Sequence, residues 1–176
     1  MENVAVYYQQ TGAVGTLAEG LKNLCQPLPG QPVFICVGTP RHILDCLGPL
    51  TGTMLKEIAP RAAIYGTLDE PLHGRNLASF LHGIRLQHPG SLEIAVDASL
   101  GNRGQLGLVK GRLGPLLPGR ALAKRLPEVG DVSLTGVVGI RGNRLHPAPE
   151  MDLSYIYHMA RLLSEALSLW YETREK

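Results

Sequence analysis

Apolar residues along the chain follow two alternating patterns, short continuous runs and longer stretches with helical spacing. The runs 33–37 and 92–96 are short, largely apolar and bounded by turn residues, which is typical of strands buried on both faces of a sheet. Leu17, Leu21 and Leu24 recur instead at the spacing of one helix face. The same patterns predict helices over 13–24, 47–58, 77–84 and 153–170, further strands over 62–65, 106–110 and 132–138, and at 4–8 either a short edge strand or an irregular lead-in.

The alternation of strands and helices determines the expected fold class. It predicts an α/β fold in which a mostly parallel sheet is covered by helices on both faces. The chain has 176 residues, and single domains commonly have about 100–200, so we expect one domain over 1–176. The stretch 111–119 is rich in Gly and Pro, but the apolar pattern resumes beyond it. We therefore interpret it as a loop and not as a domain boundary.

Composition and charge narrow the possible classes of protein. Hydrophobic residues make up 44% of the chain and charged residues 18%, which is typical of a globular protein. With 17 Lys and Arg against 15 Asp and Glu, the net charge of +2 gives no reason to expect nucleic-acid or membrane binding. Cys25, Cys36 and Cys46 are odd in number and form no CxxC pair, which indicates neither a disulfide framework nor a zinc site. Without a secretory leader or a membrane-spanning apolar stretch, we expect a cytoplasmic protein.

Two aspartates, Asp45 and Asp97, lie after expected buried strands. Ligands of open α/β sheets bind beyond the carboxyl ends of the strands, so both residues are candidates for a site. Asp97 directly follows the apolar run 92–96, where a carboxylate does not favour folding. Two structural alternatives stay open. Asp45 could cap the helix that starts near Leu47, and Asp97 could accept hydrogen bonds from the glycine-rich turn behind it.

Several sequence blocks resemble the YyaC family of sporulation proteins, in the order in which that family has them. The first block, CVGTPRHILDCLGPLTGT, contains Asp45, and the block IAVDA contains Asp97. The matching blocks are Cys36–Thr53, Tyr65–His73 with Asn76 and Leu77, Ile94–Ala98, Lys110–Gly119 and Leu126–Gly136, which together cover roughly residues 30 to 140.

The YyaC family is similar to the germination protease of spore-forming bacteria and, more distantly, to hydrogenase maturation proteases. The resemblance implies a three-layer αβα sandwich around a mostly parallel, mixed sheet, of the phosphorylase/hydrolase-like kind. One catalytic aspartate of the germination protease lies in a D-A-L-G-P segment, which resembles the sequence from Asp45 to Pro49. The other lies in an I-D-A-L segment, which resembles the sequence from Val96 to Ser99 except at its last place. The resemblance therefore implies that Asp45 and Asp97 are catalytic.

An aspartate pair can hydrolyse a peptide bond. Two nearby carboxylates do not both ionise readily, so one takes a proton from water while the other protonates the departing nitrogen. The resemblance thus implies a spore-associated endopeptidase of the forespore or mother cell, acting on proteins or peptides, with small spore proteins as candidate substrates. The alternatives are a non-catalytic sporulation protein that binds a partner through the same cleft, and a metal-assisted maturation protease.

The chain departs from these relatives at one position that bears on metal binding. The germination protease has a histidine in an H-P-G segment, and hydrogenase maturation proteases use a histidine as the third metal ligand. Here the segment begins with Leu117, which cannot bind a metal. His42 and His73, in the matching blocks, could replace it, but we expect no metal or other cofactor and assign both, with Thr39, to substrate binding.

All charged residues between Asp97 and Glu128 are basic, and this stretch contains no acidic residue. If this stretch lies near the aspartates, its charge would favour an acidic peptide or a terminal carboxylate. We accordingly assign Arg103 and Arg120 to substrate binding. The alternative is a solvated basic face without a ligand. The basic residues of the stretch are Arg103, Lys110, Arg112, Arg120, Lys124 and Arg125.

Overall fold

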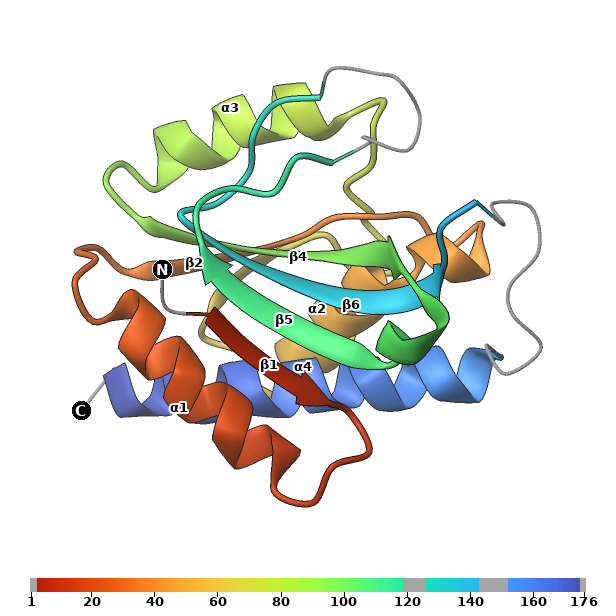
Figure 1. Cartoon of the computed structure of the whole chain (residues 1–176). Coiled ribbons are helices and arrows are strands. Elements are labelled where there is room, and N and C mark those ends of the chain that lie inside the picture. The colour runs from red at the N-terminus through yellow and green to blue at the C-terminus, as the bar shows by residue number, and fades with distance from the viewer. Residues whose placement is uncertain (1–2, 119–125, 143–151, 175–176) are drawn as a thin grey trace.

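The computed structural model describes residues 3–118, 126–142 and 152–174, and its helices and strands alternate along most of the chain (Figure 1). The strands are β1 (Asn3–Tyr7), β2 (Pro32–Cys36), β3 (Ala63–Tyr65), β4 (Leu92–Gly101), β5 (Leu108–Leu113) and β6 (Val132–Ile140). The α-helices are α1 (Ala13–Cys25), α2 (Leu47–Ile58), α3 (Leu77–Gln87) and α4 (Leu153–Arg174), and the short 3₁₀ helices are η1 (Ile43–Asp45) and η2 (Arg103–Gln105). The segment near the N-terminus, predicted as a strand or an irregular lead-in, is thus a strand.

The strands form one sheet in the order β1-β5-β6-β4-β2-β3. The pairs β6–β4, β4–β2 and β2–β3 are parallel, whereas β5 is antiparallel to both of its neighbours. Helices α1, α2 and α4 cover one face, and α3 lies over the other (Figure 1). The predicted α/β class with a mostly parallel, mixed sheet between helices is therefore confirmed.

Side chains of β2 alternate between two apolar clusters, because successive residues of a strand point to opposite faces. Phe34 and Cys36 belong to the cluster under α1, α2 and α4, whereas Val33 and Ile35 belong to the cluster under α3. All five residues of β2 are buried, as its apolar sequence predicts. Trp170 of α4 is also buried and its ring lies 6.2 Å from that of Phe34, so its predicted place in the core is confirmed.

Several predicted boundaries differ from those of the structure, and two of the errors concern the neighbourhood of the site. The strand predicted to end at Val96 continues to Gly101, so Asp97 lies inside β4 and not after it. The predicted loop over 111–119 begins too early, because β5 extends to Leu113. In both cases the end of the strand pairs with β6, which lies far away in the sequence. Such pairing leaves no apolar pattern in the neighbouring residues from which the end of the strand could be predicted. No helix among the described residues combines the length and apolar character that a membrane span requires.

Candidate active site

Asp45 lies beyond the carboxyl end of β2, in a loop whose two ends, at Thr39 and Asp45, are joined by a hydrogen bond. The backbone N–H of Thr39 donates to the backbone carbonyl of Asp45 over 2.9 Å, which closes the loop between them. Gly38 makes this closure possible, because its φ of 141° is rarely adopted by other residues. A side chain at Gly38 would also overlap the backbone carbonyl of Asp45.

The start of α2 fixes the position of the Asp45 loop against β2. Gly48 lies so close to the backbone of Val37 that a Cβ there would overlap the Val37 carbonyl. The N-cap residue of α2 is Cys46, and no side chain caps the helix. Capping therefore does not explain Asp45, and the first of the two structural alternatives is excluded.

Asp97 occupies the β4 position at which the neighbouring strand β2 ends. Cys36, the last residue of β2, pairs with Val96, and from Asp97 onward β4 pairs with β6 alone. The burial of β4 changes at the same place, from fully buried residues before Asp97 to partly buried residues after it. Asp97 is thus held within a strand, at the point where β4 extends beyond the end of β2.

The second structural alternative, in which the Asp97 carboxyl accepts hydrogen bonds from the glycine-rich turn, is not what the structure shows. Asp97 Oδ1 accepts the N–H of the next residue, Ala98, over 2.7 Å. The glycine-rich turn closes on itself, with the side chains of Asn102 and Gln105 bonded to backbone amides within η2.

The pKa values of both carboxyls lie above their ordinary value. Burial, together with the charge of Asp45, raises the pKa of Asp97 to about 8, and the bond from Ala98 N–H only partly opposes this rise. Burial also raises the pKa of Asp45, whereas a backbone hydrogen bond from Thr39 and the nearby His42 and His73 lower it. The two carboxyls therefore interact, and their environments differ in a way that favours a proton on Asp97 and a charge on Asp45.

The loop that carries His73 joins the site through β2. Val37 forms a bridge with Leu72, and the N–H of Gly38 donates to the Leu72 carbonyl over 2.7 Å. His73 follows directly and is partly buried. Asn76 holds the loop, because its Oδ1 accepts the N–H of His73 over 2.9 Å. Sequence reasoning included Asn76 in a matching block but missed this role, which the spacing of His73 and Asn76 could have indicated.

The other residues assigned to substrate binding differ in how near to the aspartate pair they lie. Thr39 and His42 lie in the Asp45 loop, with Thr39 partly buried and His42 exposed. Arg103 is exposed in η2, beyond the end of β4. Arg120 lies outside the described residues, as do Lys124 and Arg125. The site therefore brings together Asp45, Asp97, Thr39, His42 and His73.

The basic stretch is not gathered at the aspartates. Lys110 and Asp97 both pair with Thr135 of β6, so two strand spacings, roughly 10 Å, separate their backbones. Arg112 lies further toward the amino end of β6, beside Ser133, and its guanidinium donates to the carbonyls of neighbouring residues 113 and 115. Where it is described, the stretch thus follows β5 away from the site.

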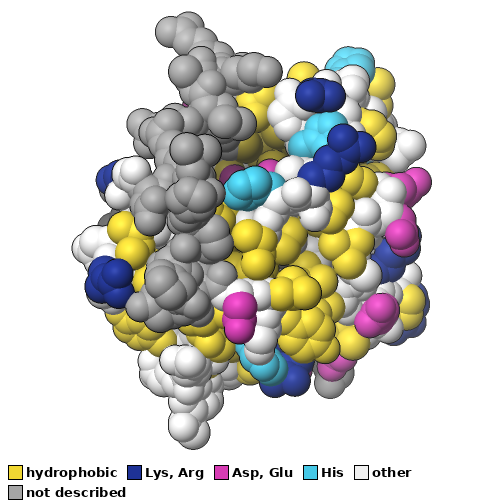
Figure 2. Space-filling model, turned by 90° about the vertical axis from the view of Figure 1, so that its right-hand side faces the viewer, with side chains coloured by type: hydrophobic (Ala, Val, Ile, Leu, Met, Phe, Trp, Pro, Cys, Tyr) yellow, Lys and Arg dark blue, Asp and Glu magenta, His cyan; other side chains and the backbone are white. Residues whose placement is uncertain are grey.

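Figure 2 views the molecule from the carboxyl ends of the parallel strands. Histidine, Lys and Arg side chains gather there beside a recess, and acidic side chains are visible inside it (Figure 2). This arrangement agrees with an acidic pair that has a basic rim.

The surroundings of the Cys46 thiol disfavour the thiolate, which is the nucleophilic form. Burial raises its pKa, and the charge of Asp45 raises it further. Burial raises the pKa of the core residue Cys36 to about 12.

The residues of the site do not fit a bound metal ion. Among the described residues, no group of three or more His, Cys, Asp or Glu side chains could hold one. Leu117 has no donor atom, and His42 and His73 do not complete such a group with the two aspartates. We therefore derive no step of a reaction through a metal.

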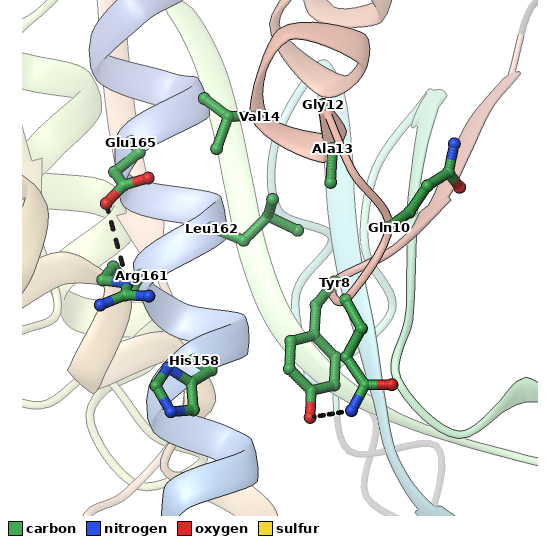
Figure 3. Close-up of a pocket in the computed structure, with 10 residues that line it drawn as sticks. Tyr8, Gln10, Gly12, Ala13, Val14, His158, Arg161, Leu162 and Glu165 are labelled. Carbon is green, nitrogen blue, oxygen red and sulfur yellow. Dashed lines mark hydrogen bonds and ion pairs between the residues drawn. The ribbon is translucent and has the colours of Figure 1, made fainter.

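A second groove, of about 500 Å³, lies between the first turn of α1 and α4, away from the aspartates (Figure 3). Its polar side chains largely satisfy one another. Arg161 pairs with Glu165 over 3.8 Å, and Gln9 donates to the Tyr8 hydroxyl over 3.0 Å. Glu165 is the one carboxyl among the described residues that line this groove, so the groove has no carboxyl pair, and the two aspartates are the better candidate for a reaction.

Comparison with known proteins agrees with this architecture. Residues 5–166 match the family described as "Protein of unknown function (DUF1256)". The uncharacterized protein YyaC of Bacillus subtilis (strain 168) is 36% identical over 173 residues, which cover 96% of this chain and 84% of YyaC.

A solved structure has the same fold. The [NiFe] hydrogenase maturation protease HycI from Thermococcus kodakarensis KOD1 superposes with a TM-score of 0.51 at 17% identity, covering 86% of this chain and 98% of HycI. At this identity the match concerns the fold alone. It agrees with the resemblance to hydrogenase maturation proteases that the sequence indicates.

Proposed function

The chain belongs to the DUF1256 family, and from that membership, the protease-like fold and the interacting carboxyls of Asp45 and Asp97 we propose that it is an endopeptidase that uses this aspartate pair. One observation carries the proposal. Two carboxyls interact at the carboxyl edge of the sheet, and neither has the structural role that would otherwise explain it.

The two aspartates have different roles in the proposed reaction. Asp45 takes a proton from the attacking water, and a backbone hydrogen bond from Thr39 stabilises its charged form against the effect of burial. Asp97 starts with a proton on Oδ2, because Oδ1 already accepts the N–H of Ala98, and gives this proton to the departing amide nitrogen. After the reaction the proton gained by Asp45 passes to Asp97, which restores the pair.

The substrate and the location are proposed on the resemblance to a family of sporulation proteins. We expect small spore proteins, or peptides from them, as substrates, in the cytoplasm of the forespore or mother cell. In addition to the pair, Thr39, His42, Arg103 and Arg120 are the candidates for substrate contact. Metal-assisted hydrolysis is the second candidate function. The fold of HycI favours it, but the lack of a third ligand among the described residues does not.

Cleavage assays with conservative variants test the proposal. Asp45→Asn and Asp97→Asn each remove one acid–base group at nearly constant shape, so we expect each to lower kcat by about 100-fold or more. Cleavage of unfolded spore proteins is followed by mass spectrometry. Glu57→Gln on the exposed side of α2 is the matched control and should retain full activity. Undiminished cleavage by both aspartate variants would exclude the pair, and loss of cleavage with a chelator would favour the metal-assisted reaction.

A further inference from the structure

His73 is held by its own loop in one orientation. Its backbone N–H donates to Asn76 Oδ1 over 2.9 Å, and Asn76 Nδ2 donates to the Pro71 carbonyl over 3.0 Å. On the other side, Leu72 is fixed to the end of β2 by its bridge with Val37. The backbone on both sides of His73 is therefore anchored.

A backbone hydrogen bond also defines which ring nitrogen of His73 carries the proton. The N–H of Arg75 donates to His73 Nδ1 over 3.3 Å. A nitrogen that accepts a hydrogen bond carries no proton, so the neutral ring has its proton on Nε2. The loop thus leaves one ring donor, Nε2–H, on the side away from Arg75.

The His73 loop and the Asp45 loop meet at the end of β2. Gly38 donates to the carbonyl of Leu72, the residue before His73, and Thr39 next to it donates to the carbonyl of Asp45. The His73 side chain is close enough to Asp45 to lower the pKa of its carboxyl. His42 acts on Asp45 as well, but it is exposed in the turn before η1, whereas His73 is partly buried.

We propose that His73 is a catalytic hydrogen-bond donor whose Nε2–H binds the carbonyl oxygen of the scissile peptide bond. The inference rests on the proposed peptidase function and adds to it the group that stabilises the negative charge of the transition state. Donors placed in advance at the position of an oxyanion are among the largest contributions to such reactions. The aspartates cannot serve this purpose, because one is negative and the other gives its proton to the nitrogen.

The atoms and protons of the proposed step balance. The water oxygen bonds to the carbonyl carbon, the water proton passes to Asp45, and an electron pair moves onto the carbonyl oxygen that faces His73. When the C–N bond breaks, this pair re-forms the C=O bond and the Asp97 proton goes to the nitrogen. His73 keeps its proton throughout, so no further reactant is needed.

Two substitutions separate the donor from the loop anchor. In His73→Asn, Oδ1 takes the place of Nδ1 and can still accept the N–H of Arg75, but the donor at the Nε2 position is lost. In His73→Gln the amide nitrogen replaces Nε2–H, whereas the acceptor for Arg75 is lost. We expect H73N to keep the wild-type Tm and KM and to lose about 100-fold in kcat, and H73Q to keep kcat within about 10-fold of wild type.

The tautomer is measured independently of activity. The ¹⁵N shifts of the neutral His73 imidazole in the whole protein should show a protonated Nε2 and an unprotonated Nδ1. The opposite tautomer, or equal kcat values for H73N and H73Q, would overturn the donor role. Absence of cleavage by the wild type would instead count against the peptidase function itself, and the imidazole shifts would still decide the arrangement of His73.

Discussion

The position of the Asp97 carboxyl is unfavourable for folding but favourable for the proposed chemistry. The fold buries it beside a second carboxyl, and both conditions oppose ionisation, so the pKa rises to about 8. Such a residue lowers the stability of the protein whenever it is charged, but it provides a proton at neutral pH. This conflict between stability and chemistry is typical of functional sites and distinguishes Asp97 from an ordinary strand residue.

Asp97→Asn tests this conflict through the pH dependence of stability. The folded pKa of about 8 exceeds the ordinary value of 3.8, so the folded state binds more protons between these values and stability falls as pH rises from about 4 to about 8. Asn cannot ionise and can still accept the N–H of Ala98. We therefore expect D97N to be more stable than wild type at pH 9, on the order of 2–5 kcal/mol, but not at pH 4. Urea unfolding at both pH values measures this, and an equal difference at the two would contradict a buried, proton-bearing Asp97.

At the scale of elements, the contact between β2 and α2 positions the Asp45 loop. The first turn of α2 has no side-chain cap. Instead, Gly48 lets the helix approach the backbone of Val37, and the hydroxyl of Thr51 donates to the Leu47 carbonyl over 2.8 Å. The glycine of the Asp-Cys-Leu-Gly-Pro segment therefore has a steric role, because it sets the distance between helix and strand and with it the place of Asp45.

Gly48→Ala should be strongly destabilising for this reason. The added Cβ would overlap the Val37 carbonyl, and a backbone atom cannot move aside easily, so we expect a loss of about 2–4 kcal/mol in the free energy of unfolding. Gly83→Ala in α3 is the control, since nothing lies within 4 Å of its added Cβ. It should stabilise the protein by about 0.5–1 kcal/mol through helix propensity. Urea unfolding of both variants measures the difference, and a neutral G48A would mean that α2 can move away from β2.

At the scale of the whole molecule, α4 joins distant parts of the chain. Its residues Trp170 and Tyr171 contact Phe34 of β2, with ring centroids 6.2 and 5.9 Å apart. Its last residue, Arg174, donates over 3.2 Å to the carbonyls of Cys25, Leu28 and Gly30, which lie in or after the last turn of α1. The C-terminal helix thus holds the connection that leads into β2, and through β2 the strand end at which the site lies.

Arg174→Ala tests this connection. Loss of the charged donor leaves the loop between α1 and β2 less restrained, and we expect stability to fall by about 1–2 kcal/mol with faster amide exchange over residues 25–31. Arg161→Ala on the same helix is the control. Its exposed pair with Glu165 should contribute less than about 0.5 kcal/mol. Similar effects of both substitutions on stability and on exchange would contradict the special role of Arg174.

Much of the fold could be predicted from apolar spacing, because a buried strand or a buried helix face requires apolar residues at regular positions within a short stretch of the chain. The bounds of α2 agree with the prediction, and the buried run of β2 agrees within one residue at each end. The end of β4 could not be predicted in this way, since Asp97 to Gly101 stay in the strand only because β6 pairs with them. For the site, the sequence indicated both aspartates, but not that Asn76 and Arg75 orient His73.

Local sequence by itself determined the order and type of the elements and the presence of two acidic residues near buried strands, because these depend on side-chain polarity and spacing along the chain. Only the tertiary structure decided that the carboxyls of Asp45 and Asp97 interact and that the pKa of Asp97 rises to about 8. Ionisation depends on solvent access and on nearby charges, and both arise when segments far apart in the sequence are brought to one edge of the sheet.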